Sequence, residues 1–573
     1  MNRSPTAIIQ RCNELQRYWL PRNQKMKSWY RLIQMVDELK TDKMESFVGN
    51  DPRSLFNLVL HMLDVSAPVR VENINSMDLD EVTAASSVSG FFDTAIKDVA
   101  RQFRRSGPRQ SINRTRIGYL LATGWYAEFS IITDDGNRAY TDIWNPAEVY
   151  PLWDGDGGLS EVAHITSIPA SKARLLSTRN GWSIDRIYGR SIKVYDYWWA
   201  EHAEVFPFQR VIFNAIVIDT KLVKFAPTRF INWPIYTAPV GGLPDMGALS
   251  EGSELSNSNF NAGAFTRSER WKEDIGQAIV ATNEHIYRTW NKWWSFSLQL
   301  LRDTAQPRIF ERSRSGKSIV KPEDVFRRGA IFRGGPDDSV EFMASPAMPL
   351  ELRSTQLDLE AMMQRGGVNW SMFGAVQGRM SAIVMSQIAA SANQIMKPFH
   401  QAIVNLNDDE ANDWLDDIRH RNISPYGWKL PTALPEDAIL STRYEVEIPG
   451  DIVQRVTVAR MADPDFRLSY SYVIEKFFPD IKDRLKERAM VRTDIAEMHP
   501  TNAVIALIEY YRQQAAFLRN SAGDEESAKL YDMAAEAALA QLGGQQEQQQ
   551  QPIPSNGTSP QPIPAQLRPP RVQ

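Results

Sequence analysis

The stretch from residue 268 to residue 301 constrains the fold of this 573-residue chain more than any other. Apolar residues and one threonine recur in it at steps of three and four, which is the spacing of one face of an α-helix. They are Trp271, Ile275, Ile279, Thr282, Ile286, Trp290 and Trp293. Ser268 and Glu269 suit a helix N-terminus, so the pattern predicts a single helix about 50 Å long. Charged residues fall off this face, which predicts an amphipathic helix that needs a packing neighbour. Taken alone, such a helix equally fits the core of a large α-rich domain.

The composition excludes several classes of protein. A single cysteine, Cys12, excludes an intramolecular disulfide and a multi-cysteine zinc site, and is typical of a reducing compartment. The formal charge of −4 argues against a protein that coats nucleic acid through a basic surface, although not against loose contact with DNA. We expect no signal peptide, because the N-terminal segment MNRSPTAIIQRCNELQRYW has no apolar h-region. We expect no membrane span, because no apolar run reaches about 18 residues.

In the first half of the chain, the sequence pattern predicts helices followed by strands. Residues 1–65 and 80–104 have helical periodicity. From Arg116 onward, short β-rich runs alternate with the turn sequences DDGN, NP and DGDGG, and further strand-like segments lie within residues 192–226. A Pro- and Gly-rich link then leads into the long helix.

In the second half of the chain, the sequence pattern predicts short β segments followed by more helices. Loops rich in Arg, Gly and Pro separate the β segments of residues 302–346, and a return helix runs from residue 349 to Gly366. Another long helix is expected from Ser381 to about Asn407, a strand over residues 443–448, and helices up to residue 542. The Gln- and Pro-rich tail has too little apolar content to fold. The expected fold class is α+β, mainly α.

The sequence shows no convincing catalytic or metal-binding motif. Gly316-Lys317-Ser318 resembles the end of a P-loop, but the position that requires the first glycine holds Glu311. The seven histidines form no HExxH motif and no pair at ligand spacing. The acids between Asp408 and Asp417 lack the pattern of a calcium loop and are interpreted as a solvated helix face. We therefore expect no enzyme activity, cofactor or metal.

The order of these segments resembles the portal proteins of tailed bacteriophages. The segment GYLLATGWYAEFSIITDDGNRAYTDIWNPAEVYPLWD is similar to the portal body, in which a helix leads to a hairpin and a turn of the form I-x-P-x-x-V-x-P, represented here by Ile143-Trp144-Asn145-Pro146 with Val149 and Pro151. LELRSTQLDLEAMMQRGGVNWSMFGAV is similar to the return helix and tunnel loop, and MSAIVMSQIAASANQIMKPFHQAIVNLNDDEANDWL to the long helix beyond them. The β-rich segment near residues 190–230 has no clear counterpart beyond the wing.

The resemblance implies a division of the chain into named parts. These are a wing with an α/β body (1–265), a stem helix (266–301), a clip (302–346), a return stem helix (347–367), a tunnel-loop region (368–380), a wing helix with strand return (381–490), a helical crown (491–542) and a disordered tail (543–573). It also implies a homo-oligomeric ring of typically twelve subunits at the capsid vertex of the virion. The Trp residues Trp290, Trp293 and Trp294 are expected as buried anchors at the clip end.

The resemblance further implies partners and sites. Double-stranded DNA would pass through the ring, which would dock terminase, major capsid and scaffolding proteins, and adaptor or tail proteins, after assembly in the host cytoplasm. The candidates for DNA proximity are Lys272, Arg288, Lys292, Trp370, Gln377 and Arg379. The candidates for partner docking at the clip are Arg308, Arg312, Arg314, Arg327 and Arg328. The glycines expected to let the tunnel loop flex are Gly366, Gly367, Gly374 and Gly378.

Two other functions remain open at this point. One is a nucleic-acid-processing enzyme, such as a phosphohydrolase with a dispersed carboxylate site, which a clustered metal-ligand set would distinguish. The other is a different virion structural protein, such as a minor head or baseplate component. Rings with a central hole of duplex width would favour the portal over both.

Overall fold

The computed structural model describes most of the chain and divides it into two compact units, Met1–Thr457 and Val458–Gln573. Its description covers residues 4–40, 45–64, 69–71, 79–107, 111–133, 135–154, 158–182, 190–202, 210–241, 276–305, 309–314, 316–321, 331, 333–342, 351–368, 382–436, 438–442, 490–493, 500–519 and 525–548. Helices predominate and the strands form small antiparallel sheets, so the fold is α+β and mainly α, as the sequence predicts. Among the helices described, none has the length and apolarity needed to cross a bilayer.

The chain begins with three helices of the first unit, as the periodicity predicts: α1 Pro5–Tyr18, α2 Leu20–Ile33 and α3 Asp51–Leu63. The Ser4 side chain accepts a hydrogen bond from the Ala7 amide at 3.2 Å and so caps the first of them. Ile8, Cys12 and Leu15 lie at helical spacing on α1 and are buried. They pack against a sheet, which gives this helix its neighbour.

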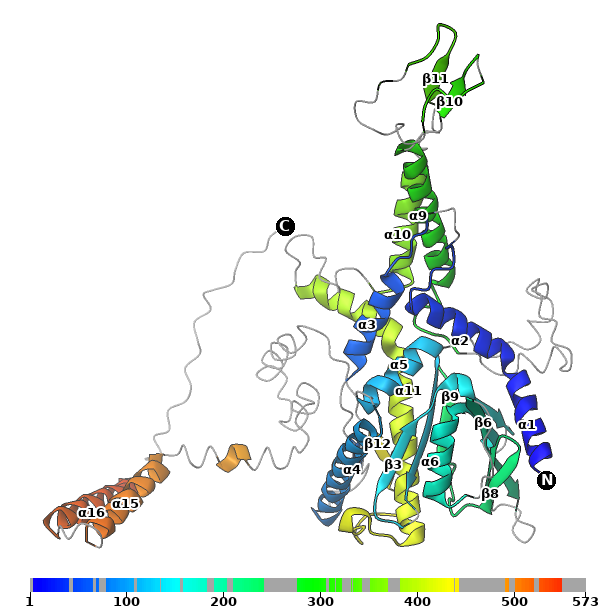
Figure 1. Cartoon of the computed structure of the whole chain (residues 1–573). Coiled ribbons are helices and arrows are strands. Elements are labelled where there is room, and N and C mark those ends of the chain that lie inside the picture. The colour runs from blue at the N-terminus through cyan, green and yellow to red at the C-terminus, as the bar shows by residue number, and fades with distance from the viewer. Residues whose placement is uncertain are drawn as a thin grey trace, which may run out of the picture. The chain divides into compact units, whose positions relative to one another are not determined.

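That sheet has five antiparallel strands in sequence order (Figure 1): β4 Val149–Trp153, β5 Leu159–Pro169, β6 Ser191–His202, β7 Arg210–Ile218 and β8 Lys221–Pro227. The short helix α6 (Ala170–Asn180) joins the second strand to the third. Alternate residues Tyr195, Tyr197 and Trp199 pack toward α1, while Trp198 belongs to the cluster on the other side. The strand predictions for residues 192–226 are therefore confirmed, with the two-residue alternation of a sheet buried on both faces.

A second sheet, ordered β3-β2-β9, lies against long helices. Its strands are β2 Trp125–Ile132, β3 Ala139–Ile143 and β9 Ile235–Pro239, and the helices are α4 Leu79–Arg105, α5 Ile112–Thr123 and α11 Ala382–Arg421. The 3-10 turn η1 (Pro146–Glu148) follows β3, where the proline turn was expected. Val88 and Phe92 of α4 share one buried cluster with Trp414 of α11.

α11 is longer than the sequence indicates. It was expected to end near Asn407 but continues through the acidic run to Arg421. The reason is packing: Trp414, Leu415 and Ile418 recur at helical spacing among the acids and are buried. A further short strand, β12 Leu440–Thr442, pairs antiparallel with β1 Val69–Val71. The strand expected over residues 443–448 lies outside the described residues.

The helix predicted for residues 268–301 begins later than its periodicity indicates. α9 spans Glu284–Ala305, and residues 276–283 before it are not helical. Gly276 has a φ of +77°, which ends any helical continuation at that point. Residues 268–275 lie outside the described residues.

Hydrogen bonds to other parts of the chain replace the helical pattern in this segment. The Gln277 amide donates to the Val240 carbonyl at 2.7 Å, and the Ile279 amide donates to the Leu121 carbonyl at 2.9 Å. Ile279 is buried, as its apolar character requires, but in an irregular segment that crosses the core. Apolar residues at steps of three and four are therefore not sufficient for a helix here.

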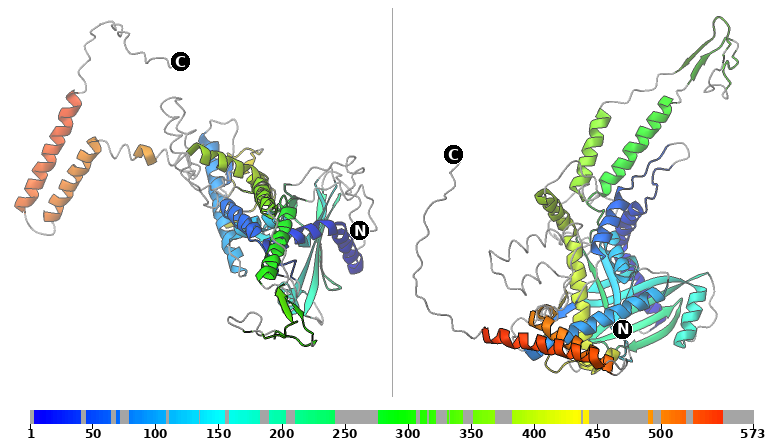
Figure 2. Two further views of the ribbon diagram at one scale, coloured as in Figure 1. Left: turned by 90° about the horizontal axis from the view of Figure 1, so that it is seen from above. Right: turned by 90° about the vertical axis from the view of Figure 1, so that its left-hand side faces the viewer.

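α9 is followed by a hairpin and a return helix. β10 (Ile309–Arg312) pairs antiparallel with β11 (Ser339–Phe342), and α10 (Glu351–Arg365) packs beside α9. Figure 1 and the right view of Figure 2 show α9 and α10 side by side, with the hairpin beyond their far ends. The predicted sequence of helix, β-containing insert and return helix is thus present.

The second unit contains a helical hairpin of α15 (Pro500–Phe517) and α16 (Glu525–Gln548). The expected crown ended at residue 542, and a disordered tail was expected from Gly543. The helix instead continues through Gly543 and Gly544 to Gln548. Once a helix is formed, each added residue contributes a hydrogen bond, and Gln and Glu are good helix formers that offset the cost of glycine, about 1 kcal/mol per residue.

Candidate functional site

The candidate site is the pair of helices α9 and α10 together with the β10–β11 hairpin, because the candidate residues that the structure describes lie on or directly beside these elements. Nine of the candidates lie outside the described residues: Lys272, Arg308, Arg327, Arg328, Trp370, Gln377, Arg379, Gly374 and Gly378. The structure places the other six, Arg288, Lys292, Arg312, Arg314, Gly366 and Gly367.

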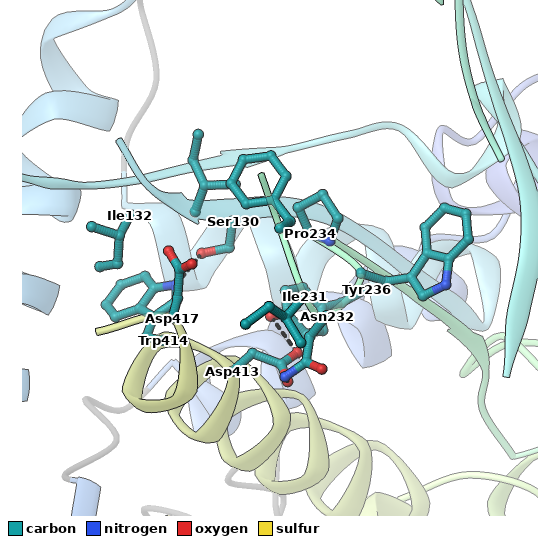
Figure 3. Close-up of a pocket in the computed structure, with 12 residues that line it drawn as sticks. Ser130, Ile132, Ile231, Asn232, Pro234, Tyr236, Asp413, Trp414 and Asp417 are labelled. Atoms are coloured by element: carbon teal, nitrogen blue, oxygen red, sulfur yellow. Dashed lines mark hydrogen bonds between the residues drawn. The ribbon is translucent and has the colours of Figure 1, made fainter. Parts of the chain in front are cut away.

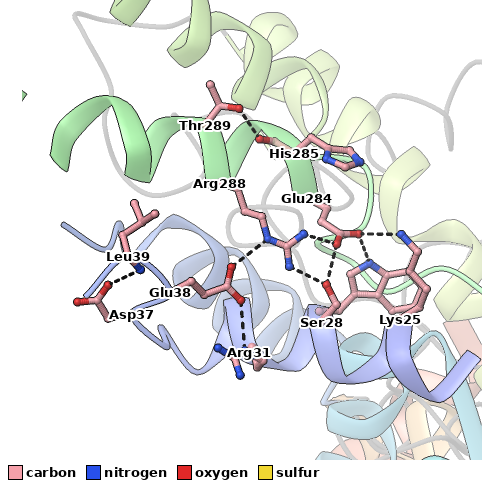
Figure 4. A network of polar contacts seen from close by, with 11 residues as sticks. Lys25, Ser28, Arg31, Asp37, Glu38, Leu39, Glu284, His285, Arg288 and Thr289 are labelled. Atoms are coloured by element: carbon pink, nitrogen blue, oxygen red, sulfur yellow. Dashed lines mark hydrogen bonds and ion pairs between the residues drawn. The ribbon is translucent and has the colours of Figure 1, made fainter. Parts of the chain in front are cut away.

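Glu284, the first residue of α9, anchors the helix to α2 (Figure 4). Its carboxylate accepts hydrogen bonds from the Ser28 hydroxyl at 2.7 Å and the Trp29 indole nitrogen at 2.9 Å. Lys25 lies 3.7 Å away. Burial raises the pKa of Glu284, but the bonds from Ser28, Arg288 and the neighbouring cation outweigh it, so the net pKa is lowered. An ionised carboxylate at a helix N-terminus also interacts favourably with the helix dipole.

The DNA-channel candidate Arg288 belongs to the same network (Figure 4). Its guanidinium lies 2.6 Å from Glu284 and 3.2 Å from Glu38, and it also donates to the Ser28 hydroxyl at 2.7 Å. Glu38 in turn pairs with Arg31 at 3.2 Å. The charge of Arg288 is thus largely compensated inside the subunit. Lys292, one turn further along, is exposed.

The three Trp residues of α9 lie at the body end of the helix. Trp290 and Trp293 are buried in the largest core cluster, and their rings stack at 6.1 Å between centroids. Trp294 meets Trp293 edge-on at 5.1 Å and Phe47 at 5.5 Å. The expectation that they anchor the clip end is therefore wrong. It followed from the assumed start of the helix at residue 268, which moved these residues toward the wrong end.

The stem, the pair of helices α9 and α10, exposes large apolar side chains along its length, which the sequence did not single out. Their exposed fractions are 62% for Phe296, 66% for Leu301, 59% for Leu357 and 48% for Met362. The first two lie on α9 and the other two on α10. We define these four residues as the stem apolar surface. Exposed fractions of this size are uncommon for several large apolar residues on adjacent elements.

The β10–β11 hairpin is held by its own acids. Glu311 accepts hydrogen bonds from the Ser318 hydroxyl at 2.9 Å and the Val320 amide at 3.1 Å, and the Ser318 bond contributes most to lowering its pKa. Asp338 accepts from the Gly335 amide at 2.7 Å, so Gly335 belongs to a closed turn. The Ser318 hydroxyl of the P-loop-like sequence is thereby engaged in the hairpin itself.

Of the clip candidates in the described hairpin, Arg312 and Arg314 are both exposed. Arg314 pairs with Asp337 at 3.1 Å, with 84% of the arginine side chain exposed. Exposed pairs of this kind contribute at most about 1 kcal/mol to stability. The two guanidinium groups are therefore accessible to a partner.

Gly366 and Gly367 end α10 next to the start of α9. A Cβ on Gly366 would lie 2.0 Å from the Asn283 Oδ1 atom, and a Cβ on Gly367 would lie 3.1 Å from the Met363 carbonyl oxygen. Asn283 is buried and its amide nitrogen donates to that carbonyl at 2.9 Å. Close packing between the two stem helices therefore requires Gly366.

We expect Gly366→Ala to lower the free energy of unfolding by about 1–3 kcal/mol, because the added methyl group displaces Asn283 and breaks its bond to α10. The measurement is the thermal unfolding midpoint of the purified chain. Gly90→Ala is the matched control, since Gly90 lies within α4 and a Cβ there meets no atom within 4 Å. An equal midpoint for Gly366→Ala and the unaltered chain would contradict this packing role.

The acidic run on α11 is only in part the solvated face that the sequence indicates: Asp409 is exposed, whereas Asp413 lies among polar partners (Figure 3). Asp413 accepts hydrogen bonds from the Asn232 amide at 2.6 Å and the Tyr236 hydroxyl at 2.8 Å, and burial raises its pKa to about 6. These residues line a cavity of about 20 Å³, enough for about one water molecule. In the part of the chain that the structure describes, no group of three or more His, Cys, Asp or Glu is placed to hold a metal ion.

Glu410, another acid of the run on α11, lies in a buried polar network. Arg116 donates to Glu128 at 2.7 and 2.5 Å and lies 3.4 Å from Glu410. Glu410 also accepts from the Ser130 hydroxyl at 2.5 Å. Glu128 is fully buried, and the network joins α5, β2 and α11. These acids therefore serve to connect core elements.

Comparison with known proteins gives weak similarities. No family model and no curated protein matches the chain. Among solved structures, it is similar to a chain in the neck of an empty gene transfer agent (GTA) particle, with 10% identity, a TM-score of 0.38, and coverage of 74% of this chain and 89% of that one. It is also similar to a chain in the virion of a native GTA particle, with 11% identity, a TM-score of 0.38, and coverage of 74% and 87%. At such values these similarities by themselves assign neither a fold nor a function to this chain.

Proposed function

We propose that the chain is a structural subunit of a phage-like particle, and specifically its portal: a ring at the capsid vertex through which double-stranded DNA is packaged and released. The observation that carries the proposal is the projecting pair α9–α10, which bears a β hairpin at its far end and exposes apolar side chains along its length. The proposal assigns no catalytic step and no cofactor to the chain.

The stem apolar surface supports assembly into a ring. Phe296 and Leu301 on one helix, and Leu357 and Met362 on the other, are exposed although each helix already packs against its partner. Apolar surface that stays exposed on both helices of the pair would be buried by contact with neighbouring subunits. A ring with rotational symmetry supplies two different neighbours, one for each side, through heterologous contacts that close.

The charge on the stem supports passage of DNA rather than tight binding. Each phosphate that a Lys or Arg neutralises releases counterions and raises affinity, and contacts repeated around a ring would hold the duplex. Arg288 is already neutralised by Glu284 and Glu38, which lowers its capacity for phosphate. Lys292 remains the exposed stem candidate for transient contact with DNA.

The hairpin supports a docking role. It lies beyond the far ends of α9 and α10 (Figure 1) and exposes Arg312 and Arg314. In the proposed portal, terminase and later adaptor or tail proteins bind at this end. A planar guanidinium makes two parallel bonds to a carboxylate, so acidic segments of these partners are the expected ligands.

Electron microscopy of the purified full-length chain tests the proposal. We expect closed rings with a central hole wide enough for a DNA duplex. Leu301→Glu combined with Leu357→Glu should abolish rings and leave folded monomers with unchanged circular dichroism, because buried carboxylates without partners oppose assembly. His285→Glu, an exposed change on the same helix, is the control and should leave rings intact. Monomers or flat sheets of the unaltered chain would overturn the portal in favour of another particle component.

A further inference from the structure

The hairpin of α15 and α16 has an unusual distribution of apolar residues. Between the helices it buries mostly small side chains, namely Ile508, Ala515, Ala528 and Ala535. On its outside it exposes larger ones, at 44–67% of their area: Ile505, Leu507, Tyr510, Phe517, Leu530, Met533 and Leu539. An independent hairpin would place its large apolar residues inside.

The exposed residues form a stripe on each helix. On α15, Leu507, Tyr510 and Phe517 are spaced by three and seven residues, and on α16 Leu530 and Met533 are spaced by three. Ala537 and Ala540, both exposed, continue the second stripe at helical spacing. We call these the α15 stripe and the α16 stripe. Both lie outside the buried contact between the two helices.

The two helices differ in charge. α15 carries one acid, Glu509, and one arginine, Arg512, while Arg519, which follows it, pairs with Asp532 of α16 in the same hairpin. α16 carries five acids against one lysine, Lys529; the acids are Glu525, Glu526, Asp532, Glu536 and Glu547. Contact between two copies of α16 would bring like charges together, whereas contact of the acidic α16 with α15, whose charges balance, avoids this repulsion.

We propose that the C-terminal hairpin associates side by side with the hairpins of neighbouring copies, the α15 stripe of one copy covering the α16 stripe of the next. The contact is heterologous, so each hairpin uses both of its outer sides. This inference names a second assembly surface in addition to the stem apolar surface and does not depend on passage of DNA. The ring centroids of Tyr511 and Tyr531 lie 6.0 Å apart across the hairpin, so these two residues are at the same height along the helix axes. Tyr510 and Met533 are therefore near one level, on opposite outer sides.

Cysteine cross-linking of the full-length chain tests the proposal. The native Cys12 is buried, and burial raises its pKa to about 12, so it does not compete for a thiol reagent. In Tyr510→Cys combined with Met533→Cys, a short bismaleimide should join successive copies into a ladder of dimers, trimers and larger species. Each single variant should give no ladder. The matched control pair, Ala516→Cys with Glu525→Cys, is exposed but off both stripes and should remain largely monomeric on a denaturing gel.

Other outcomes overturn the proposal in distinguishable ways. Dimers from Met533→Cys alone would show contact between two copies of α16 and reject the heterologous form. An internal link within one chain, or no link at all, would reject association between copies. Electron microscopy of the same sample separates this inference from the proposed function: rings without a ladder reject only the hairpin contact, and a ladder without rings rejects only the portal.

Discussion

Gly276→Ala is expected to lower the free energy of unfolding by more than about 3 kcal/mol, or to prevent folding of the first unit. Gly276 has a φ of +77°, and a Cβ would lie 2.4 Å from the Gly124 carbonyl oxygen and 2.8 Å from the Trp125 ring. Left-handed backbone costs an L-residue about 1–2 kcal/mol, and overpacking adds typically about 1–3 kcal/mol. Because the near atoms include backbone, a rotamer change cannot relieve the contact.

This contact matters because three parts of the chain meet at it. The Gly124 carbonyl accepts the Val240 amide at 2.8 Å, and the Val240 carbonyl accepts the Gln277 amide at 2.7 Å. The end of α5, the end of β9 and the segment that leads to α9 are thereby held together. An added methyl group forces this junction apart and disturbs the base of the stem.

The measurement is the thermal unfolding midpoint and the yield of soluble protein. The matched control is Gly118→Ala within α5, where a Cβ would meet no atom within 4 Å. That control should be neutral or raise stability by up to about 1 kcal/mol, as alanine favours helices. Equal midpoints for Gly276→Ala and Gly118→Ala would contradict the close approach.

The same glycine shows what the sequence could and could not predict. Helical spacing correctly placed Trp290 and Trp293 on one face of a helix, because that pattern continues through α9. It wrongly extended the helix to earlier residues, because the backbone of Gln277 and Ile279 bonds to residues more than thirty positions away. Long-range hydrogen bonds leave no periodic signature in the local sequence.

The strands could be predicted from the sequence and the burial of the acids on α11 could not, because only the strands have local sequence signals. The turn sequences DDGN, NP and DGDGG located the breaks between β2, β3, β4 and β5, since a turn signal is local. The burial of Glu410 and Asp413 could not be predicted from a run of acids, because their partners Arg116 and Tyr236 lie far away in the sequence. The exposure of Phe296 and Leu301 is equally invisible, since apolar residues at helical spacing are normally expected inside.

Arg116→Met is expected to lower the free energy of unfolding by about 3–5 kcal/mol at neutral pH, because it leaves the buried oxygen atoms of Glu128, Asn407 and Glu410 without this hydrogen-bond donor. Glu128 is fully buried and Arg116 bonds it through two nitrogens. Asn407 and Glu410, also buried, lose the same guanidinium. The measurement is denaturant unfolding of the full-length chain. A loss below about 1 kcal/mol would show that the network contributes little.

Glu128→Gln separates the contribution of charge from that of hydrogen bonding. Burial raises the pKa of Glu128 from 4.5 to about 8, although Arg116 opposes the shift. Between these values the native state retains a proton that the unfolded chain releases, so the stability contributed by this group is greatest below pH 4.5 and is lost as the pH rises toward 8, by up to about 1.4 kcal/mol per pH unit. Glu128→Gln removes this dependence and should flatten the profile over that range. Arg116→Met should extend the fall to higher pH without steepening it, because loss of the cation that favours ionised Glu128 raises the pKa of Glu128 further. A variant Glu128→Gln with the same pH dependence as the unaltered chain would place the titration on another group.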